Sequence, residues 1–320
     1  NTFLKAGIYY SKFRGINTNL NITSRDFLLG NSRSMISVSV GESMQMDASH
    51  FQYIGRNKSV AVVAKVNLER LYIETFDDFK QDGAYKQLFY KAAIDIQNSS
   101  NNRYSIGAGT SIEKVHFNPA ISSVNEARGN FSSMKTYVFF KYNTLNKGFY
   151  PTRGVKINTE LGRVYNQKPN VTLYQNGIPT GPAAISFDNY TRFYLDGLAH
   201  IPINASFNLF TEFQSGINFT NKPNPLNNFS IGGLNGYFRN QIKFAGFQEA
   251  SLNSPSAVML QAGLRYNVVN NLYLIGRFTS LLKDFVAINN GPAQASFLSG
   301  YALTFAYKSP IGPVELSMMY

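Results

Sequence analysis

The sequence predicts an all-β fold, a sixteen-stranded antiparallel transmembrane β-barrel. Read with a period of two, the chain divides into sixteen amphipathic runs separated by turn residues. The 320 residues give 20 residues for each strand with its connection (320/16), close to what a membrane strand and a turn require. The longest uninterrupted apolar run covers only residues 60–64, far short of the roughly 20 residues of a membrane helix.

The runs follow one another along the whole chain, and the connections between them alternate in length. The runs cover residues 3–11, 14–24, 33–43, 46–54, 58–70, 84–97, 102–115, 131–143, 153–166, 187–200, 204–219, 237–248, 257–268, 271–283, 296–308 and 312–320. Short links near 98–102, 202–203 and 270–271 predict tight turns, whereas links near 115–131, 166–186, 219–237 and 283–296 are longer. Short periplasmic turns and long surface loops are typical of outer-membrane barrels.

The runs separate an apolar face from a polar face. In run 204–219, for example, Leu209 and Phe213 alternate with Glu212 and Gln214. A soluble sandwich also alternates, but its polar face meets bulk water. Here the polar faces mix acids, bases and amides on neighbouring runs, which favours a water-filled or plugged lumen.

Composition agrees with a bacterial outer-membrane location. Aromatic residues make up 14% of the chain, all Phe and Tyr, which suits girdles at the two membrane interfaces. There is no Cys, so thiolate catalysis and Cys-based metal sites are excluded. The formal charge is +12, but Lys and Arg are scattered singly, so we expect polar loops, a polar lumen and attraction to anionic lipid rather than nucleic-acid binding.

The last run has a regular amphipathic pattern. Val314, Leu316, Met318 and Tyr320 fall on alternate positions and predict an apolar face that ends on an aromatic side chain. In a closed barrel such a strand has no free edge. The pattern resembles the C-terminal assembly signal of bacterial outer-membrane barrels.

A glycine-rich stretch at 221–247 stands apart from the strand pattern, because it contains Gly232-Gly233-Leu234-Asn235-Gly236-Tyr237. Together with Tyr150-Pro-Thr-Arg-Gly154 and Ser309-Pro-Ile-Gly-Pro-Val314, it resembles the superfamily of BamA, TamA and the two-partner secretion transporters. Phe244-Ala-Gly-Phe247 makes the chain most similar to the C-terminal barrel of Bacteroidota patatin-like phospholipases. The resemblance implies a sixteen-stranded barrel with a long surface loop folded inward.

One departure concerns the loop arginine. The superfamily motif reads Val/Ile-Arg-Gly-Phe/Tyr, and its Arg reaches the inner barrel wall. The matching residues here are Leu234-Asn235-Gly236-Tyr237, so the Arg is missing, and Arg239 is a candidate substitute. The missing Arg favours the patatin-type branch over the insertases.

The residues themselves point to no catalytic or metal site. Patatin-like hydrolysis needs a G-x-S-x-G motif with an Asp partner, and the chain has no such motif. Ser215 lies in a predicted strand and is expected to face lipid, and Ser299 likewise lies within a run. The histidines, His50, His116 and His200, are far apart in the sequence and fall in different predicted strands or loops, so we expect no metal and no cofactor.

The prediction is therefore a single barrel domain over residues 1–320, the C-terminal part of a longer protein. It would anchor and export a patatin-like lipid hydrolase joined ahead of Asn1. The alternative is a BamA/TamA-like insertase or translocator, and a plain porin is the third reading. Expected partners are outer-membrane lipids and, during biogenesis, the barrel assembly machinery, with a homodimer or a complex with other envelope proteins left open.

Overall fold

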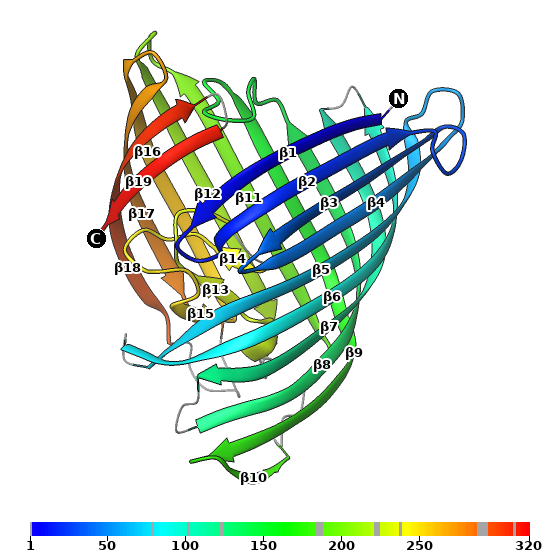
Figure 1. Ribbon diagram of the computed structural model, residues 1–320, viewed down its shortest axis with the longest axis vertical. Coiled ribbons are helices and arrows are strands. Elements are labelled where there is room, and N and C mark those ends of the chain that lie inside the picture. The colour runs from blue at the N-terminus through cyan, green and yellow to red at the C-terminus, as the bar shows by residue number, and fades with distance from the viewer. Residues whose placement is uncertain are drawn as a thin grey trace. The chain divides into compact units, whose positions relative to one another are not determined.

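The computed structural model describes residues 2–77, 80–100, 103–121, 125–182, 188–220, 225–236, 239–286, 294–309 and 312–320 (Figure 1). The described elements are almost all strands. They are β1 (Thr2–Ser11), β2 (Gly15–Arg25), β3 (Ser32–Gly41), β4 (Met44–Ile54), β5 (Val60–Asp77), β6 (Lys80–Ser100), β7 (Tyr104–Ile121), β8 (Asn125–Asn143), β9 (Gly154–Gln175), β10 (Ile178–Pro182), β11 (Tyr190–Pro202), β12 (Phe207–Phe219), the short helix η1 (Pro225–Asn227), β13 (Phe229–Ile231), β14 (Gln241–Ile242), β15 (Leu252–Ser254), β16 (Ser256–Val269), β17 (Leu272–Lys283), β18 (Ser296–Ser309) and β19 (Gly312–Met319).

Sixteen strands form one sheet, as the sequence predicts, and they follow one another in chain order. One of the sixteen differs from the prediction. The predicted run 237–248 is not a strand of this sheet, and the sixteenth member is β10, a short strand that pairs with β9. Run 237–248 instead contributes β14 to a separate three-stranded sheet. Its alternating apolar residues reflect packing inside a folded loop, which gives the same pattern as a membrane strand.

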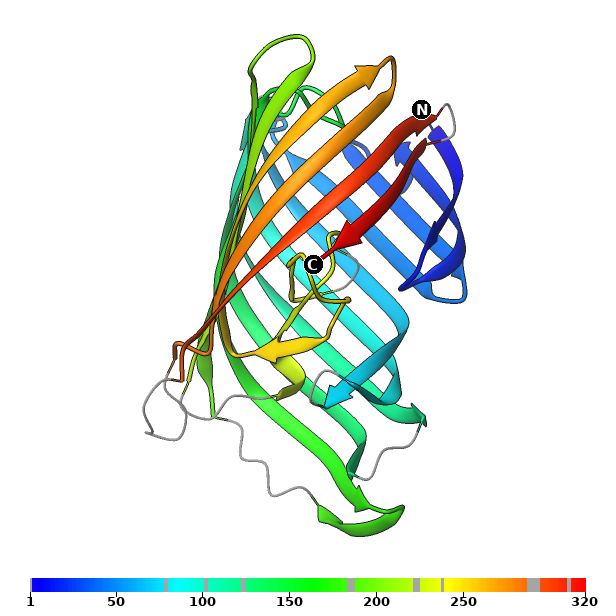
Figure 2. The ribbon, with the colours of Figure 1, turned by 90° about the vertical axis from the view of Figure 1, so that its left-hand side faces the viewer.

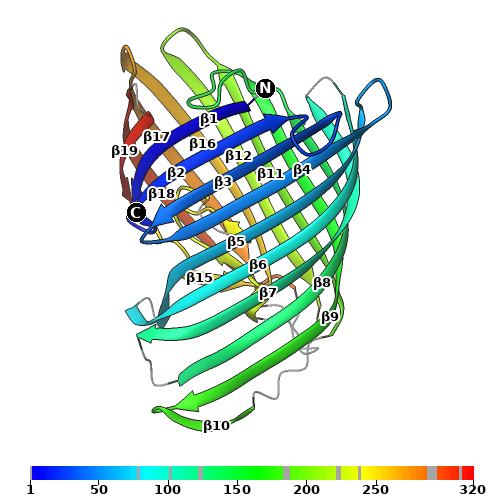
Figure 3. The same ribbon diagram turned by 45° about the vertical axis from the view of Figure 1, so that its right-hand side comes forward.

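The first compact unit comprises residues 1–100, 105–138 and 162–190. Strands β1 to β6 pair antiparallel in succession and lie side by side in Figures 1 and 3. Their apolar faces are exposed, while the opposite faces carry amides, hydroxyls and buried ion pairs. Arg14 donates to Glu69 at 2.6 Å, and Asp95 accepts from both Lys65 and the Tyr137 hydroxyl.

The second compact unit comprises residues 101–104, 139–161 and 191–320. Strands β11, β12, β16, β17, β18 and β19 pair antiparallel in that order. Leu209 and Leu260 are 42% and 53% exposed, whereas Gln214 and Gln261 on the other face are 3% and 4% exposed. The two predicted faces are confirmed here, and the polar one is covered by the segment between β12 and β16, drawn in yellow beside the orange strands in Figure 2.

Several strands extend beyond the predicted runs. β7, β8 and β9 have 18, 19 and 22 residues, about twice the 9–11 that a membrane strand needs. They occupy most of the predicted loops 115–131 and 166–186, so those two predictions are wrong in detail. The physical reason is that backbone pairing continues past the bilayer, where alternation of apolar side chains is no longer required. In the described ranges, no helix is long and apolar enough to cross a membrane.

Candidate functional site

The candidate site is a folded plug, defined as residues 225–255, on the polar face of the second unit. Its own sheet has the order β14-β13-β15, with β13 parallel to β14 and antiparallel to β15. A bridge between Gly233 and Phe244 continues the pairing of β13 with the segment after β14. The glycine-rich stretch is therefore an ordered structure with its own backbone hydrogen bonds.

The plug is attached to the strands by an apolar core. Phe229, Ile231, Ile242 and Phe244 of the plug are at most 1% exposed. They pack with Ala257 and Met259 of β16 and Leu281 of β17, which occupy the face that is polar elsewhere. Burial of large apolar side chains of this kind stabilises a contact by roughly 1.5–3 kcal/mol each relative to exposure. The plug is thus bound as part of a hydrophobic core.

Two wall glycines admit plug atoms. A side chain at Gly216 of β12 would collide with the ring of Phe229, and one at Gly300 of β18 would collide with the carbonyl oxygen of Ala245. Both positions lie on the covered face of their strands. The wall is therefore shaped for this plug, since even a methyl group has no room there.

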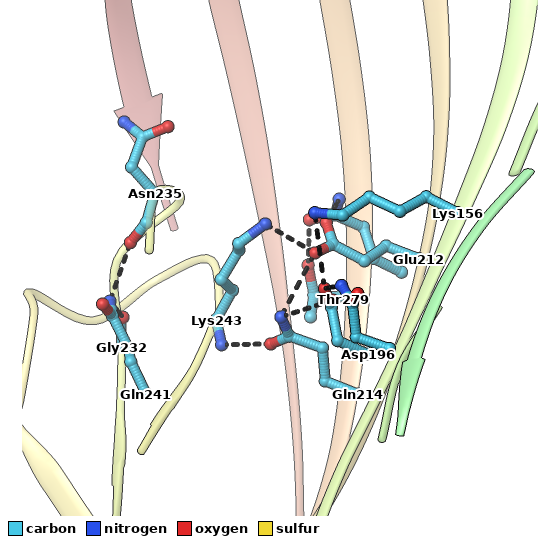
Figure 4. Close-up of polar contacts among 11 residues, drawn as sticks. Lys156, Asp196, Glu212, Gln214, Gly232, Asn235, Gln241, Lys243 and Thr279 are labelled. Carbon is cyan, nitrogen blue, oxygen red and sulfur yellow. Dashed lines mark hydrogen bonds and ion pairs between the residues drawn. The ribbon is translucent and has the colours of Figure 1, made fainter. Parts of the chain in front are cut away.

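A polar network joins the plug to the same wall (Figure 4). Lys243 Nζ lies 2.5 Å from Glu212 Oε1 of β12, and its backbone N–H donates to Gln214 Oε1 at 2.8 Å. Gln214 Nε2 in turn donates to Asp196 Oδ1 of β11 at 3.1 Å. Lys156 of β9 lies 3.8 Å from the other Asp196 oxygen. The Glu212 side chain is 7% exposed, so Lys243 supplies the positive charge that a buried carboxylate requires.

The predicted loop residues that the structure describes lie in the plug, and Gly233 has a left-handed φ of +76° there. Gly232 has a backbone reason of the same kind. Its φ is +131°, and a side chain there would collide with the Gln248 carbonyl. The remaining residues include Asn235, whose carbonyl accepts from Gln241 at 2.8 Å, and Leu234 and Gly236. Tyr237 lies outside the described residues.

Arg239 contacts the plug itself, whereas Lys243 contacts the wall. Arg239 donates to the Asn227 side chain at 3.0 Å and to the Leu226 carbonyl at 2.9 Å. Sequence reasoning missed Lys243, although a signal was present. It directly precedes the Phe244–Phe247 motif, and Glu212 was already placed on the polar face.

The other candidate residues lie outside the polar network, although the Tyr320 carbonyl lies beside Gly246 of the plug. Val314, Leu316, Met318 and Tyr320 are all well exposed on the apolar face of β19 and at its end. Ser215 falls on the same face of β12 as Phe213 and Ile217, and it is 3% exposed. The expectation that it faces lipid stays a prediction.

The histidines have structural partners in the described chain. His50 pairs with Ser34, His116 with Asn118, and His200 with Asn208 at 2.8 Å. Within the described ranges no three or more His, Cys, Asp or Glu side chains lie together as a metal site would require.

Comparison with known proteins identifies the class. A barrel with exposed apolar and covered polar strand faces is the class of the bacterial outer membrane. The sequence model described as the OMP85 superfamily matches residues 1–320, so the chain belongs to this superfamily and lies in the outer membrane. None of the curated proteins compared with the chain is similar enough to count as a relative.

Solved structures show the same fold. BamA from Haemophilus ducreyi lacking POTRA domains 1–3 has a TM-score of 0.69 at 15% identity, over all of this chain and 66% of that one. CdiB from Acinetobacter baumannii has a TM-score of 0.55 at 10% identity, over all of this chain and 59% of that one. CdiB from Escherichia coli has a TM-score of 0.58 at 8% identity, over all of this chain and 62% of that one. The chain thus spans two thirds or less of the length of these structures, and its fold is their β-barrel.

Proposed function

We propose that residues 1–320 form a single membrane domain that anchors and translocates a patatin-like lipid hydrolase domain joined ahead of Asn1. The observation that carries this proposal is the plug. Its two motif stretches, Ile231-Gly232-Gly233 and Phe244–Phe247, are those that resemble the patatin-type branch, and they pack into one core. A barrel whose lumen holds a tightly packed plug suits an anchor better than an open pore. The family assignment is also consistent with a segment that has no enzymatic activity of its own.

The experiment starts from the gene ahead of Asn1. We expect it to encode an α/β domain with a G-x-S-x-G motif and an Asp-Gly partner. The full-length protein in outer-membrane vesicles should then hydrolyse a labelled phospholipid, and Ser→Ala in that motif should abolish hydrolysis. Tandem small αβ repeats ahead of Asn1, with no hydrolase domain, would refute the proposal.

The second candidate function is insertion or translocation of other polypeptides across the outer membrane. The contact between Lys243 and Glu212 favours it, because this pair supplies the cationic contact between loop and wall that the missing motif Arg removed. The missing motif Arg is therefore a weaker argument against an insertase than the sequence alone indicated. The superfamily and the barrel fold are compatible with this function.

The ion pair between Lys243 and Glu212, called the lock from here on, offers a direct test of the second function. Lys243→Ala leaves Glu212 buried without its cation, and Lys243→Arg is the matched control that keeps the charge. If the chain inserts other proteins, Lys243→Ala should lower the amounts of other outer-membrane barrels in the cell while Lys243→Arg largely preserves them. Unchanged barrel levels, with the altered protein itself present in normal amount, would exclude an insertase that depends on this lock.

A further inference from the structure

The turn between β8 and β9 is a preformed structure. Backbone bonds join Thr144 N to the Val155 carbonyl at 2.8 Å and Asn146 N to the Arg153 carbonyl at 3.2 Å. The Asn146 side chain accepts from Thr152 N at 2.9 Å and donates to the Thr152 hydroxyl at 2.8 Å. Gly154 closes the turn with φ +112°, where a side chain would collide with the Thr144 carbonyl. These bonds join residues 144–153 to one another within the turn itself.

The strands of the second unit hold the same turn from the other side. Arg265 of β16 donates to the Pro151 carbonyl at 2.6 Å. Asn208 of β12 donates to the Thr152 carbonyl at 2.6 Å. These bonds bring the turn over the covered face of β12 and β16, where it can reach strands far away in the sequence.

Tyr150 at the tip of the turn has an unfavourable backbone conformation. Its φ is +48°, a left-handed value that aromatic residues rarely adopt. Such strain persists only where the surroundings impose it. Here the ring packs against Tyr273 of β17 in a tilted arrangement with centroids 4.8 Å apart, and the Arg265 guanidinium lies 5.9 Å from the Tyr150 ring. We infer from the strain that the contacts of the Tyr150 side chain hold its backbone in this conformation.

One of these contacts is with a carboxylate on β19. The Tyr150 hydroxyl donates to Glu315 Oε1 at 2.8 Å, across 165 positions of sequence. Burial, and then the bond to Glu315, raise the pKa of the Tyr150 phenol far above its usual value, so the hydroxyl remains a donor at neutral pH. β19 stands at the end of the strand order and is bonded along its length to β18. A contact from the turn is thus a second, independent attachment for β19.

We propose that the turn 144–153 is a strap that positions β19, with Tyr150 as the positioning residue and Glu315 as its attachment point. The strap sets the location of β19 relative to β16 and β17, in addition to the ladder with β18. Its release loosens β19 while the rest of the second unit keeps its packing. This role concerns the barrel itself and is independent of which function is correct.

The test is hydrogen exchange of the full-length protein in lipid nanodiscs, followed in peptides from β19 and from β16–β17. Tyr150→Phe removes only the hydroxyl and keeps the stacked ring. Glu315→Ala removes the acceptor, and Glu315→Gln keeps an acceptor oxygen. Tyr307→Phe is the matched control, since Tyr307 of β18 pairs with Val314 of β19 but lies on the exposed apolar face.

We expect Tyr150→Phe and Glu315→Ala each to speed exchange of β19 by about three- to tenfold, the range for loss of one hydrogen bond. Glu315→Gln should have a smaller effect, and the double variant should be no worse than either single one. Exchange in β19 no faster than in Tyr307→Phe would overturn the strap. So would an equal rise in β16–β17, because the cluster would then be general packing. Normal folding of each variant is checked by resistance to unfolding without boiling, and if Tyr150→Phe fails this check, Glu315→Ala against Glu315→Gln decides.

Discussion

At the scale of single residues, the plug depends on small and charged groups as well as on the apolar residues of the recognised motif. Gly300 and Gly216 leave room for an Ala245 carbonyl and a Phe229 ring. Lys243 compensates the charge of Glu212, whose side chain is nearly buried. Steric room and charge pairing therefore act together at one site, and either can be removed alone.

Gly300→Ala should weaken the contact between the plug and β18. The added methyl group meets the Ala245 carbonyl, which is backbone and cannot rotate away, so overpacking should cost about 1–3 kcal/mol. Gly276→Ala on neighbouring β17 is the matched control, because a side chain there meets nothing within 4 Å. Urea unfolding from lipid vesicles would measure both variants. Equal midpoints for the two would show that the plug does not rest on Gly300.

The plug site was only partly predictable from sequence. The glycine-rich stretch identified the segment, because runs of glycine are incompatible with a regular strand. Lys243 was missed because a cation between apolar residues also occurs on any exposed loop. Gly216 and Gly300 could not be recognised, since the reason for each is an atom from a segment far away in the sequence.

At the scale of strands, alternation assigns faces reliably within the membrane. Leu209 and Leu260 are exposed on one face of the β12–β16 ladder. Glu212 and Gln261 pair with each other on the opposite, covered face. The pattern does not distinguish water from a plug on the polar side. Gln214 and Gln261 were expected on the polar face, and both are covered there. Gln214 accepts from the Lys243 backbone N–H, and Gln261 donates to Glu212.

Leu209→Arg or Leu260→Arg should therefore cost about 2–4 kcal/mol if the position lies near the bilayer midplane. Ser37→Arg is the matched control, since Ser37 of β3 is half-buried, directly opposite Asp47 of β4, and away from the plug segment in sequence. It should change the free energy of unfolding by about 0.5 kcal/mol or less. Equal damage at the apolar and polar positions would show that the faces are assigned wrongly.

Sequence reasoning recovered most strands and failed at their outer ends and in the plug. Runs 204–219 and 257–268 match β12 and β16 closely, because both lie within the bilayer and need alternating apolar side chains. β9 continues to Gln175, well past its predicted end, because strand pairing continues there without strict alternation of apolar and polar residues. Run 237–248 looked like a strand because a small core selects apolar residues at similar spacing.

The strap on β19 should have a defined response to pH. The pKa of Tyr150 is raised in the folded protein, so the neutral phenol is the favoured form. Its contribution to stability is complete below about pH 10, the pKa of an unfolded Tyr, and declines as pH rises above that value. The ratio of β19 exchange between Tyr150→Phe and the unaltered protein should be equal at pH 7 and pH 9. A ratio that is lower at pH 9 than at pH 7 would show that the phenol already ionises in this range.

At the scale of the whole molecule, the barrel carries a plug and a strap, and the residues that the structure describes assemble no hydrolytic site. Ester hydrolysis by an activated serine needs a base within hydrogen-bond reach and an oxyanion pocket. Ser215 and His200 come nearest to such a pair in sequence, but they lie on opposite faces of the β11–β12 ladder. His200 is opposite Phe210 and Ser215 is opposite Leu195, five residues further along. Because a strand rises by about 3.3 Å per residue, this offset places the two side chains well beyond hydrogen-bond reach.

The purified 320-residue chain should accordingly show no esterase or phospholipase activity. The test uses a short-chain ester and a labelled phospholipid, with protein folded in detergent and checked for resistance to unfolding without boiling. Ser215→Ala is the matched control for a hidden nucleophile, and His200→Ala is the control for a hidden base. Turnover that disappears in Ser215→Ala would contradict both the site assignment and the strand register. Turnover by the full-length protein alone would instead locate hydrolysis ahead of Asn1, as the proposed function requires.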